Sequence, residues 1–275
     1  MKENLKVAAI QITSGADVNE NFRKAARLIG RAKEENAEVV ALPEYFALMA
    51  EPPEQARRAK EVSELAFPFL ARQAKENEIY LVGGGVPVLS DEDSIFDGVK
   101  KSYNVSVVFN PVGKEIGRYA KIHLFRANLA GGESYNETDI FARGAKPLLV
   151  EIEGFKVGVT ICNDIRYGEL YLELSRLGAE ILIMTAAFTR PTGELHWEVL
   201  TRARAIETQC YLVSAAQTGE NYKGRLTWGH SAIIDPSGKI IKSIADEEGI
   251  ILADLSRRRL EEARKMLPII QNRSL

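Results

Sequence analysis

Two hydrophobic patterns alternate along the chain. Short apolar runs rich in β-branched residues predict strands, whereas apolar residues that recur every three to four positions predict amphipathic helices. The predicted strands and hairpins cover residues 6–12, 37–44, 79–89, 103–111, 115–124, 146–162, 179–188, 210–219, 229–244 and 249–255. The predicted helices cover residues 19–36, 54–77, 168–178, 194–208 and 256–266. This alternation of strands and helices indicates an α/β fold.

Prolines and glycines mark sharp turns inside three of the strand segments. The turns lie at residues 111–113, 154 and 236–238, and each joins two apolar runs as in a β-hairpin. Hairpins among strand–helix units predict mixed sheets with helices packed on one or both faces. The chain has no linker, low-complexity tract, fixed-period repeat or break in composition. A single domain over residues 1–275 is therefore predicted.

The composition is that of a soluble globular protein, with 45% hydrophobic and 27% charged residues. Lys plus Arg (36) nearly balances Asp plus Glu (38), which gives no electrostatic reason to expect a nucleic-acid or membrane partner. The N-terminus lacks the pattern of a secretory signal, and the apolar runs are shorter than the ~20 residues that span a bilayer. Two cysteines without a disulfide framework fit a reducing compartment, so we expect a cytoplasmic protein.

Cys162 lies where an apolar strand meets a sharp turn, a few residues before a predicted helix. A nucleophile at such a turn is exposed at the end of the sheet, and the amide of the next residue is placed to bind an oxyanion. The helix N-terminus is expected to lower the pKa of the thiol. The alternative is that Cys162 is an ordinary buried thiol, and for Cys210 this core interpretation is favoured.

Two ionisable residues also interrupt apolar strands near their ends. Glu44 follows the run at 37–43, and Lys121 lies among apolar residues in the 115–124 segment. A buried charge is unfavourable unless it is paired or functional, so each residue needs a partner. The three histidines have no spacing that ties them to Cys162 or that indicates a zinc site.

Three motifs, found in the order LPEYF, YAKIHLF and ICNDIRYGEL, carry a resemblance that covers essentially the whole chain. The chain resembles the carbon–nitrogen hydrolase (nitrilase) superfamily. The family's Glu–Lys–Cys triad matches Glu44, Lys121 and Cys162. Segments at 196–219, 228–241 and 267–273 are most similar to the branch of amidases that act on deaminated glutathione and related ω-amides.

A second glutamate of the family lies seven residues before a glycine. Glu137 has this spacing to Gly144, whereas Glu133 has the wrong spacing. The chain also departs from the branch at two positions, since Asn163 replaces an aromatic residue and Gly168 replaces a proline. Asn163 adjoins the expected oxyanion site, so this change bears on the acyl pocket.

The resemblance implies a four-layer αββα sandwich with mixed sheets, paired into homodimers, and amide hydrolysis through a covalent thioester. Glu44 would be the general base for the Cys162 thiol, and Lys121 with the amide of Asn163 would bind the oxyanion. Glu137 would bind Lys121 or orient the substrate nitrogen and water. No metal or other cofactor is required by this chemistry.

The resemblance also assigns Arg166 and Thr192 to the carboxylate of a small-molecule amide substrate. A guanidinium matches a carboxylate with two parallel hydrogen bonds. An internal ion pair of Arg166 with Asp164 or Glu169 is the alternative, and the sequence leaves both open.

Other functions remain within the same resemblance. The rivals are an ω-amidase for 2-oxo acid amides, an N-carbamoyl amide hydrolase, a true nitrilase, and a binding protein on the same fold that has lost catalysis. The intact Glu44, Lys121 and Cys162 argue against the inactive binding protein.

Overall fold

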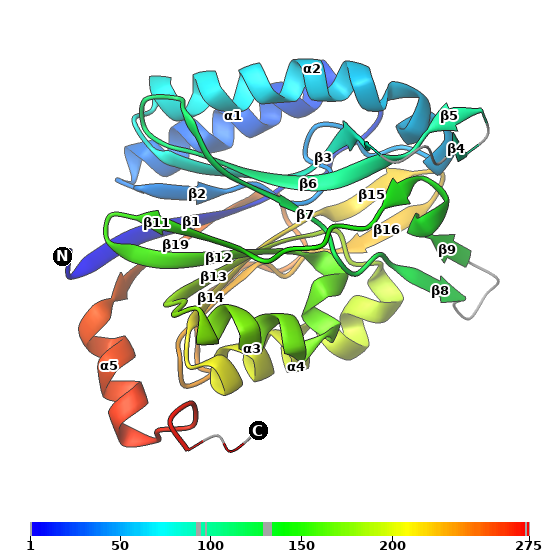
Figure 1. The fold of residues 1–275 in the computed structure, drawn as a ribbon. Coiled ribbons are helices and arrows are strands. Elements are labelled where there is room, and N and C mark those ends of the chain that lie inside the picture. Colours follow the sequence, from blue (N-terminus) through cyan, green and yellow to red (C-terminus); the bar gives the residue numbers. More distant parts are fainter. Residues whose placement is uncertain (1, 92–94, 97, 129–133, 273, 275) are drawn as a thin grey trace.

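The computed structural model describes residues 2–91, 95–96, 98–128, 134–272 and 274. Two β-sheets lie face to face in the middle of the molecule, and helices cover the outer face of each (Figure 1). The four layers follow the order α–β–β–α. Both sheets contain parallel and antiparallel pairs, as predicted.

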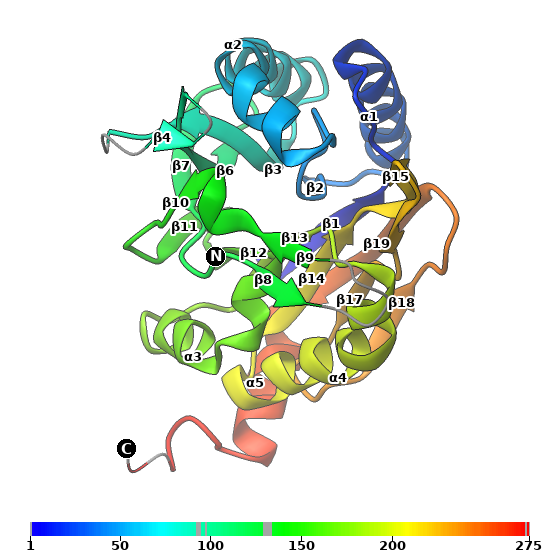
Figure 2. The same ribbon diagram turned by 90° about the vertical axis from the view of Figure 1, so that its right-hand side faces the viewer.

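The first sheet has the strand order β10–β6–β3–β2–β1–β19, with β7 paired to β6. Its strands are β1 (Asn4–Gln11), β2 (Val39–Ala41), β3 (Tyr80–Leu89), β6 (Ser102–Phe109), β7 (Glu115–Ala120), β10 (Phe141–Ala142) and β19 (Gly249–Ser256). Helices α1 and α2 cover its outer face (Figure 2). Helix α1 spans Val18–Glu34, and helix α2 spans Pro52–Glu76.

The second sheet has the strand order β11–β12–β13–β14–β17–β18. Its strands are β11 (Leu148–Ile152), β12 (Phe155–Ile161), β13 (Ile181–Ala186), β14 (Tyr211–Ala216), β17 (Ala232–Ile234) and β18 (Ile240–Ser243). Helices α3 (Gly168–Arg176) and α4 (Arg190–Thr208) cover its outer face, and α5 (Arg257–Met266) follows β19 (Figure 2). No helix in the described part of the chain is both long and apolar enough to cross a bilayer.

The strands are apolar on both faces because each sheet is covered on both sides. In β1, Val7 and Ala9 pack in the core between the two sheets, whereas Ala8 and Ile10 pack against the helices outside. All four side chains are fully buried, and they alternate with the period of two that a strand imposes. This alternation explains why the strand segments read as continuous apolar runs.

The predicted strand 210–219 is divided in the structure. β14 ends at Ala216, and the chain then leaves the second sheet. The buried side chain of Gln217 marks the break, since its Nε2 donates to Ser14 Oγ (2.8 Å) and to Glu44 O (3.0 Å). Gln217 thereby ties the end of the second sheet to loops of the first.

Several short elements were absent from the sequence prediction. They are the ribbons β4–β5 (Ile95–Phe96 and Val99–Lys100), β8–β9 (Arg126–Asn128 and Ser134–Asn136) and β15–β16 (Thr218–Tyr222 and Arg225–Trp228), together with the 3₁₀ turns η1 (Glu137–Asp139) and η2 (Cys162–Arg166). Strands of two to five residues carry too few positions for a periodic signal. Helix α4 begins at Arg190 rather than at residue 194, because Pro191 suits a first helical turn.

Candidate active site

The four predicted catalytic residues all lie just past the ends of strands or in a short turn. Glu44 follows β2, Lys121 follows β7, and Cys162 follows β12 as the first residue of η2. Glu137 is the first residue of η1. Glu44 and Lys121 thus belong to the first sheet and Cys162 to the second, so the face-to-face packing of the sheets brings them together.

The Lys121 ammonium is fully buried between two carboxylates. Its Nζ lies 2.9 Å from Glu44 Oε1 and 2.8 Å from Glu137 Oε2. Burial acts to lower the pKa of Lys121, but the charges of Glu137 and Glu44 outweigh it and raise this pKa above its usual value. Lys121 therefore stays cationic throughout the physiological pH range.

Gly144 packs directly against the backbone at Lys121. Its amide donates to Lys121 O (2.8 Å), and a Cβ at this position would lie 2.0 Å from Ala120 O. Only glycine fits so close to the backbone at Lys121, which gives a physical reason for a glycine seven residues after Glu137.

Glu44 is buried but remains able to titrate. Burial and the charge of Glu137 raise its pKa, whereas Lys121 acts to lower it. Asn104 Nδ2 donates to Glu44 Oε1 (2.8 Å), which favours the charged form. A carboxylate with a raised pKa next to a thiol is suited to general-base catalysis.

Both carboxylate oxygens of Glu137 accept hydrogen bonds. Its Oε1 accepts from Tyr45 Oη (2.8 Å) and its Oε2 accepts from the amide of Phe125 (2.7 Å), in addition to Lys121. Asn104 Nδ2 also reaches Tyr45 Oη (3.2 Å) and so links the two carboxylates. These contacts hold the Glu137 carboxylate against Lys121.

Cys162 has a left-handed backbone conformation, with φ of 47°, and a nearly buried side chain. Such a φ is strained for a residue with a Cβ and needs support from its surroundings. The support comes from the buried carboxylate of Asp164, which accepts from the amide of Ile161 (2.9 Å), from Tyr119 Oη (2.7 Å) and from the amide of His123 (3.0 Å). Asp164 thereby fixes the turn at Cys162 to the end of β7.

The expectation that a helix N-terminus lowers the pKa of the Cys162 thiol is wrong. Burial and the charge of Glu44 raise this pKa well above its usual value, although Lys121 opposes them. The residue begins a 3₁₀ turn, and α3 starts only at Gly168. The resting thiol is therefore protonated, and a nucleophilic reaction needs a base.

Asn163 and Arg166 lie together beside Cys162. Asn163 Nδ2 donates to the carbonyls of His123 and Leu124 (both 3.2 Å), and its Oδ1 accepts from Arg166 Nε (3.1 Å). Asn163 thus anchors Arg166 to the segment that follows Lys121. An aromatic hydrocarbon side chain at this position could not make these hydrogen bonds.

Arg166 has no carboxylate partner among the described residues. Its Nη1 contacts His196 Nδ1 (2.9 Å), and its guanidinium lies 4.8 Å from the centre of the Phe188 ring. The proposed alternative, an ion pair with Asp164 or Glu169, is not present in the described structure, because Asp164 binds the groups around the Cys162 turn.

A small cavity connects these residues with the thiol. Its volume is about 10 Å³, room for about one water molecule. Its lining residues are Phe125, Cys162, Asn163, Arg166, Ala187, Phe188, Thr189 and Thr192. Arg166 and Thr192 therefore share a cavity with Cys162.

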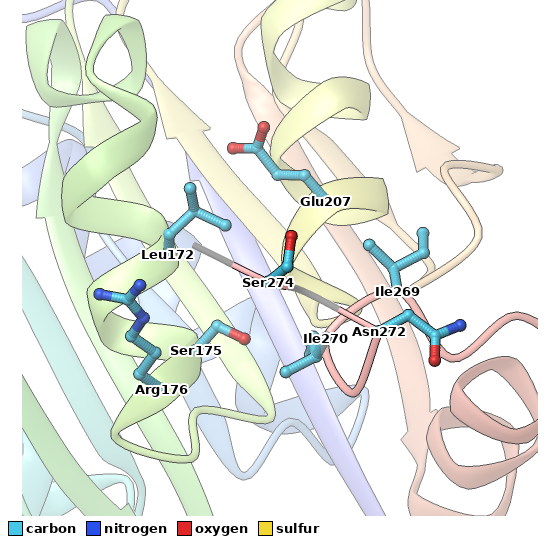
Figure 3. A pocket seen from close by; sticks show the side chains of 8 residues that line it. All are labelled: Leu172, Ser175, Arg176, Glu207, Ile269, Ile270, Asn272 and Ser274. Carbon is cyan, nitrogen blue, oxygen red and sulfur yellow. The ribbon is translucent and has the colours of Figure 1, made fainter.

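Several cavities of the described structure are larger. One of about 190 Å³ adjoins the site and is lined by Tyr45, Phe125 and Glu137, among others. Another of about 570 Å³ lies between α3, α4 and the C-terminal segment, where Figure 3 shows side chains such as Leu172, Glu207 and Ile270. It includes none of the predicted catalytic residues.

Sequence reasoning missed Asn104 and Tyr45, which connect Glu44 with Glu137. The available signals were weak. Asn104 is a polar residue in the otherwise apolar strand β6, and Tyr45 directly follows Glu44. The competing Glu133 lies outside the described residues.

Comparison with known proteins agrees with the geometry. The family model for carbon–nitrogen hydrolases matches residues 6–265. The chain belongs to the carbon–nitrogen hydrolase family. It is 38% identical over 268 residues to the deaminated glutathione amidase of Synechocystis, with 97% of each chain covered. It is 34% identical over 268 residues to an omega-amidase of Xenopus tropicalis, which covers 98% of this chain and 94% of the relative.

Solved structures support the same conclusion. Nit3 of Saccharomyces cerevisiae, described as a member of branch 10 of the nitrilase superfamily, superposes with a TM-score of 0.87 and 31% identity. The match covers 100% of this chain and 98% of Nit3. The predicted αββα sandwich of the nitrilase type is confirmed. The chain is thus an amidase-type carbon–nitrogen hydrolase that acts on bonds other than peptide bonds.

Proposed function

We propose that this hydrolase cleaves a small carboxylate-bearing amide of the deaminated-glutathione type through a thioester on Cys162. The observation that carries the proposal is the buried Lys121 ammonium, held between Glu44 and Glu137 beside a protonated thiol. The 38% identity to a relative named deaminated glutathione amidase supports the choice of substrate class.

Glu44 would first take the proton from the Cys162 thiol, because the raised pKa of that thiol rules out a resting thiolate. The sulfur then attacks the amide carbonyl carbon, and its oxygen becomes an oxyanion. Lys121 Nζ and the Asn163 amide would stabilise this charge in a buried setting, where fixed donors are most effective.

Protonated Glu44 would next donate its proton to the leaving nitrogen as the C–N bond breaks. This releases the amine or ammonia and leaves an acyl thioester on Cys162. In the second half, Glu44 takes a proton from water, the hydroxide attacks the thioester carbon, and the thiol is restored as the acid departs. Glu137 would hold Lys121 in place through both halves.

Arg166 and Thr192 would bind a carboxylate on the acyl part of the substrate. Both line the cavity at Cys162, and Arg166 has no carboxylate partner among the described residues. Burial and the neighbouring Arg166 charge lower the pKa of His196, so its Nδ1 is suited to accept from Arg166 and hold it in position.

A screen of amides tests this proposal directly. Release of amine or ammonia is measured from ω-amides of 2-oxo acids, N-acyl peptides, carbamoyl compounds and nitriles. Cys162→Ala and Glu44→Gln should abolish turnover, whereas the matched variant Cys210→Ala, at a buried thiol of the core, should retain it. Substantial turnover by Cys162→Ala would exclude the thioester mechanism.

An ω-amidase is the second candidate, since a relative of 34% identity carries that name. Both activities need the same triad and the same acyl carboxylate site. They differ in the leaving group, which is ammonia for an ω-amide and a larger amine for a deaminated peptide. Relative kcat/KM on the two leaving groups distinguishes them.

We also propose that the chain forms homodimers through the outer face of α4. Leu195 and Val199 lie one turn apart on this helix and are 70% and 68% exposed. Contiguous exposed apolar patches mark protein interfaces, and these two side chains are neighbours on one helix face. Light scattering should give a dimer for the wild type and a monomer for Leu195→Glu with Val199→Glu. A monomeric wild type would refute the proposal.

A cytoplasmic location is proposed as well. Its support is that Cys162 and Cys210 are both free thiols in the structure. Fractionation of the source cells tests it, and recovery in a secreted or oxidising fraction would contradict it.

A further inference from the structure

Arg225, at the start of β16, is a largely buried arginine without an acidic partner among the described residues. Its guanidinium lies 5.0 Å from the centre of the Tyr135 ring and 5.5 Å from that of Tyr222. By contrast, Arg204 and Arg257 are also mostly buried, and each pairs with a glutamate. Arg225 thus lies beside two aromatic rings, and no described acidic residue pairs with its charge.

One edge of the Arg225 guanidinium is only partly satisfied by hydrogen bonds in the described structure. Nη1 donates to Tyr222 Oη (2.9 Å), and Nη2 reaches Ala187 O only at 3.5 Å. Nε is buried and has no hydrogen-bond partner in the part of the chain that the structure describes. Nε and Nη2 form one of the two edges with which arginine binds a carboxylate through paired hydrogen bonds. A buried donor without a partner is unfavourable, and a bound anion would satisfy it.

This guanidinium lines the cavity of about 190 Å³ next to the catalytic residues. The same cavity is lined by Tyr45, Phe125 and Glu137. Phe125 also lines the small cavity that contains Cys162 and Arg166. The ribbons β8–β9 and β15–β16 lie at the same end of the sandwich (Figure 1). The two arginines therefore line adjoining cavities that share Phe125.

The arrangement of the acids identifies which half of a substrate enters the larger cavity. The leaving nitrogen must face Glu44, because Glu44 is the group that protonates it. Glu44 is linked through Asn104 to Tyr45, and Tyr45 binds Glu137. Tyr45 and Glu137 both line the larger cavity, so the leaving group extends into it, whereas the acyl group lies toward Arg166.

We propose that Arg225 binds a carboxylate carried by the leaving amine. The favoured substrate is then an amide whose amine is an amino acid or short peptide with a free C-terminus. This inference rests on the proposed amidase function and deepens it, because a substrate that releases ammonia has no group to reach Arg225. Tyr222 and Tyr135 would keep the guanidinium plane in position for the carboxylate.

Three amides with the same 2-oxo-diacid acyl group test the proposal. Their leaving groups are ammonia, a dipeptide with a free carboxylate, and the same dipeptide as its carboxamide. For the wild type, kcat/KM should favour the free acid over the carboxamide by about 10- to 100-fold, the range for one charge-assisted contact. Arg225→Met should bring this ratio close to one, mainly through KM, and Arg225→Lys should keep part of it.

A matched control is Arg118→Met, since Arg118 is an exposed arginine on β7 that pairs with Glu115. It should keep the wild-type ratio. Circular dichroism checks that each variant is folded. If Arg225→Met lowers kcat/KM equally on acid and carboxamide, Arg225 is structural and the proposal is wrong. If only Arg166→Met changes the ratio, the carboxylate is bound at Arg166, and the proposal is also wrong.

Calorimetry separates a failure of this inference from a failure of the proposed function. The free dipeptide and its carboxamide are titrated into wild type and Arg225→Met. Binding that needs both the carboxylate and Arg225 supports the anion site even if no amide is turned over, in which case only the amidase proposal fails. Turnover of amides without any carboxylate preference in catalysis or binding overturns the Arg225 inference alone.

Discussion

Replacing Lys121 with methionine should separate its catalytic role from its structural role. The change removes the cation from between Glu44 and Glu137 and leaves both carboxylates uncompensated. Lys121 and Glu44 are 0% and 1% exposed, so solvent does not screen the pair. Breaking a buried ion pair by removing one partner costs about 3–5 kcal/mol of the free energy of unfolding. Losing one oxyanion donor lowers kcat by about 10²–10³.

The stability of this variant should depend on pH in a defined direction. The charge of Lys121 acts to lower the pKa of Glu44, which is already raised above 4.5. Without Lys121 that pKa rises further, so the folded state binds more protons than the unfolded state. The free energy of unfolding is then highest below the unfolded pKa and falls as the pH rises through the folded pKa. Urea unfolding at a series of pH values measures this change.

The double variant Lys121→Met with Glu137→Gln is the control. Removing the second negative charge should recover part of the lost stability but none of the lost kcat. Steady-state kinetics on a well-folded sample then report the oxyanion contribution alone. Recovery of activity together with stability, or a Lys121→Met variant with only a raised KM, would refute the assignment of Lys121 to the oxyanion.

Three further predictions follow from the site. The acid limb of the kcat/KM profile should have an apparent pKa above that of an ordinary glutamate, because protonation removes the base Glu44. Asn104→Leu removes a hydrogen-bond donor to that carboxylate and should move the acid limb to higher pH. An acid limb that does not move would count against Glu44 as the base. Iodoacetamide should label Cys162 faster than Cys210, because Cys162 is 7% exposed and lies beside the base Glu44, whereas Cys210 is fully buried. Mass spectrometry of the two peptides measures the rates, and equal rates would contradict the prediction. Arg166→Met should lose about one to two decades in kcat/KM on an acyl carboxylate and much less on its ester, whereas equal losses would make Arg166 structural.

The proposed triad could be selected from sequence because each member leaves a local signal. Glu44 and Lys121 are ionisable residues at the ends of apolar strands, where burial requires a partner, and Cys162 follows a strand directly. The motifs around them supplied the order and the second glutamate. The alternation of strands and helices predicted an α/β fold with mixed sheets, and the family resemblance implied the four layers. Neither predicted the pairing order within each sheet.

The rest of the site depends on contacts between distant segments. The pKa of Cys162 was predicted in the wrong direction, because burial and Glu44 outweigh any effect of the backbone that follows the thiol. Arg225 lies in a four-residue strand with no periodic signal, and only the folded chain places it beside Tyr135. The local sequence pattern indicates which residues are buried, whereas tertiary packing determines which of these residues contact one another.

The division of the proposed catalytic residues between two sheets has a mechanical consequence. Buried hydrogen bonds connect the two sheet layers. Gln217 donates to the carbonyl of Glu44, and Tyr119 donates to the Asp164 carboxylate. A shift of a fraction of an ångström between the sheets would pull the nucleophile away from its base while leaving every strand ladder intact. Enzyme activity therefore depends on the alignment of the two sheets. On heating or under pressure, it should fade before circular dichroism records any loss of structure.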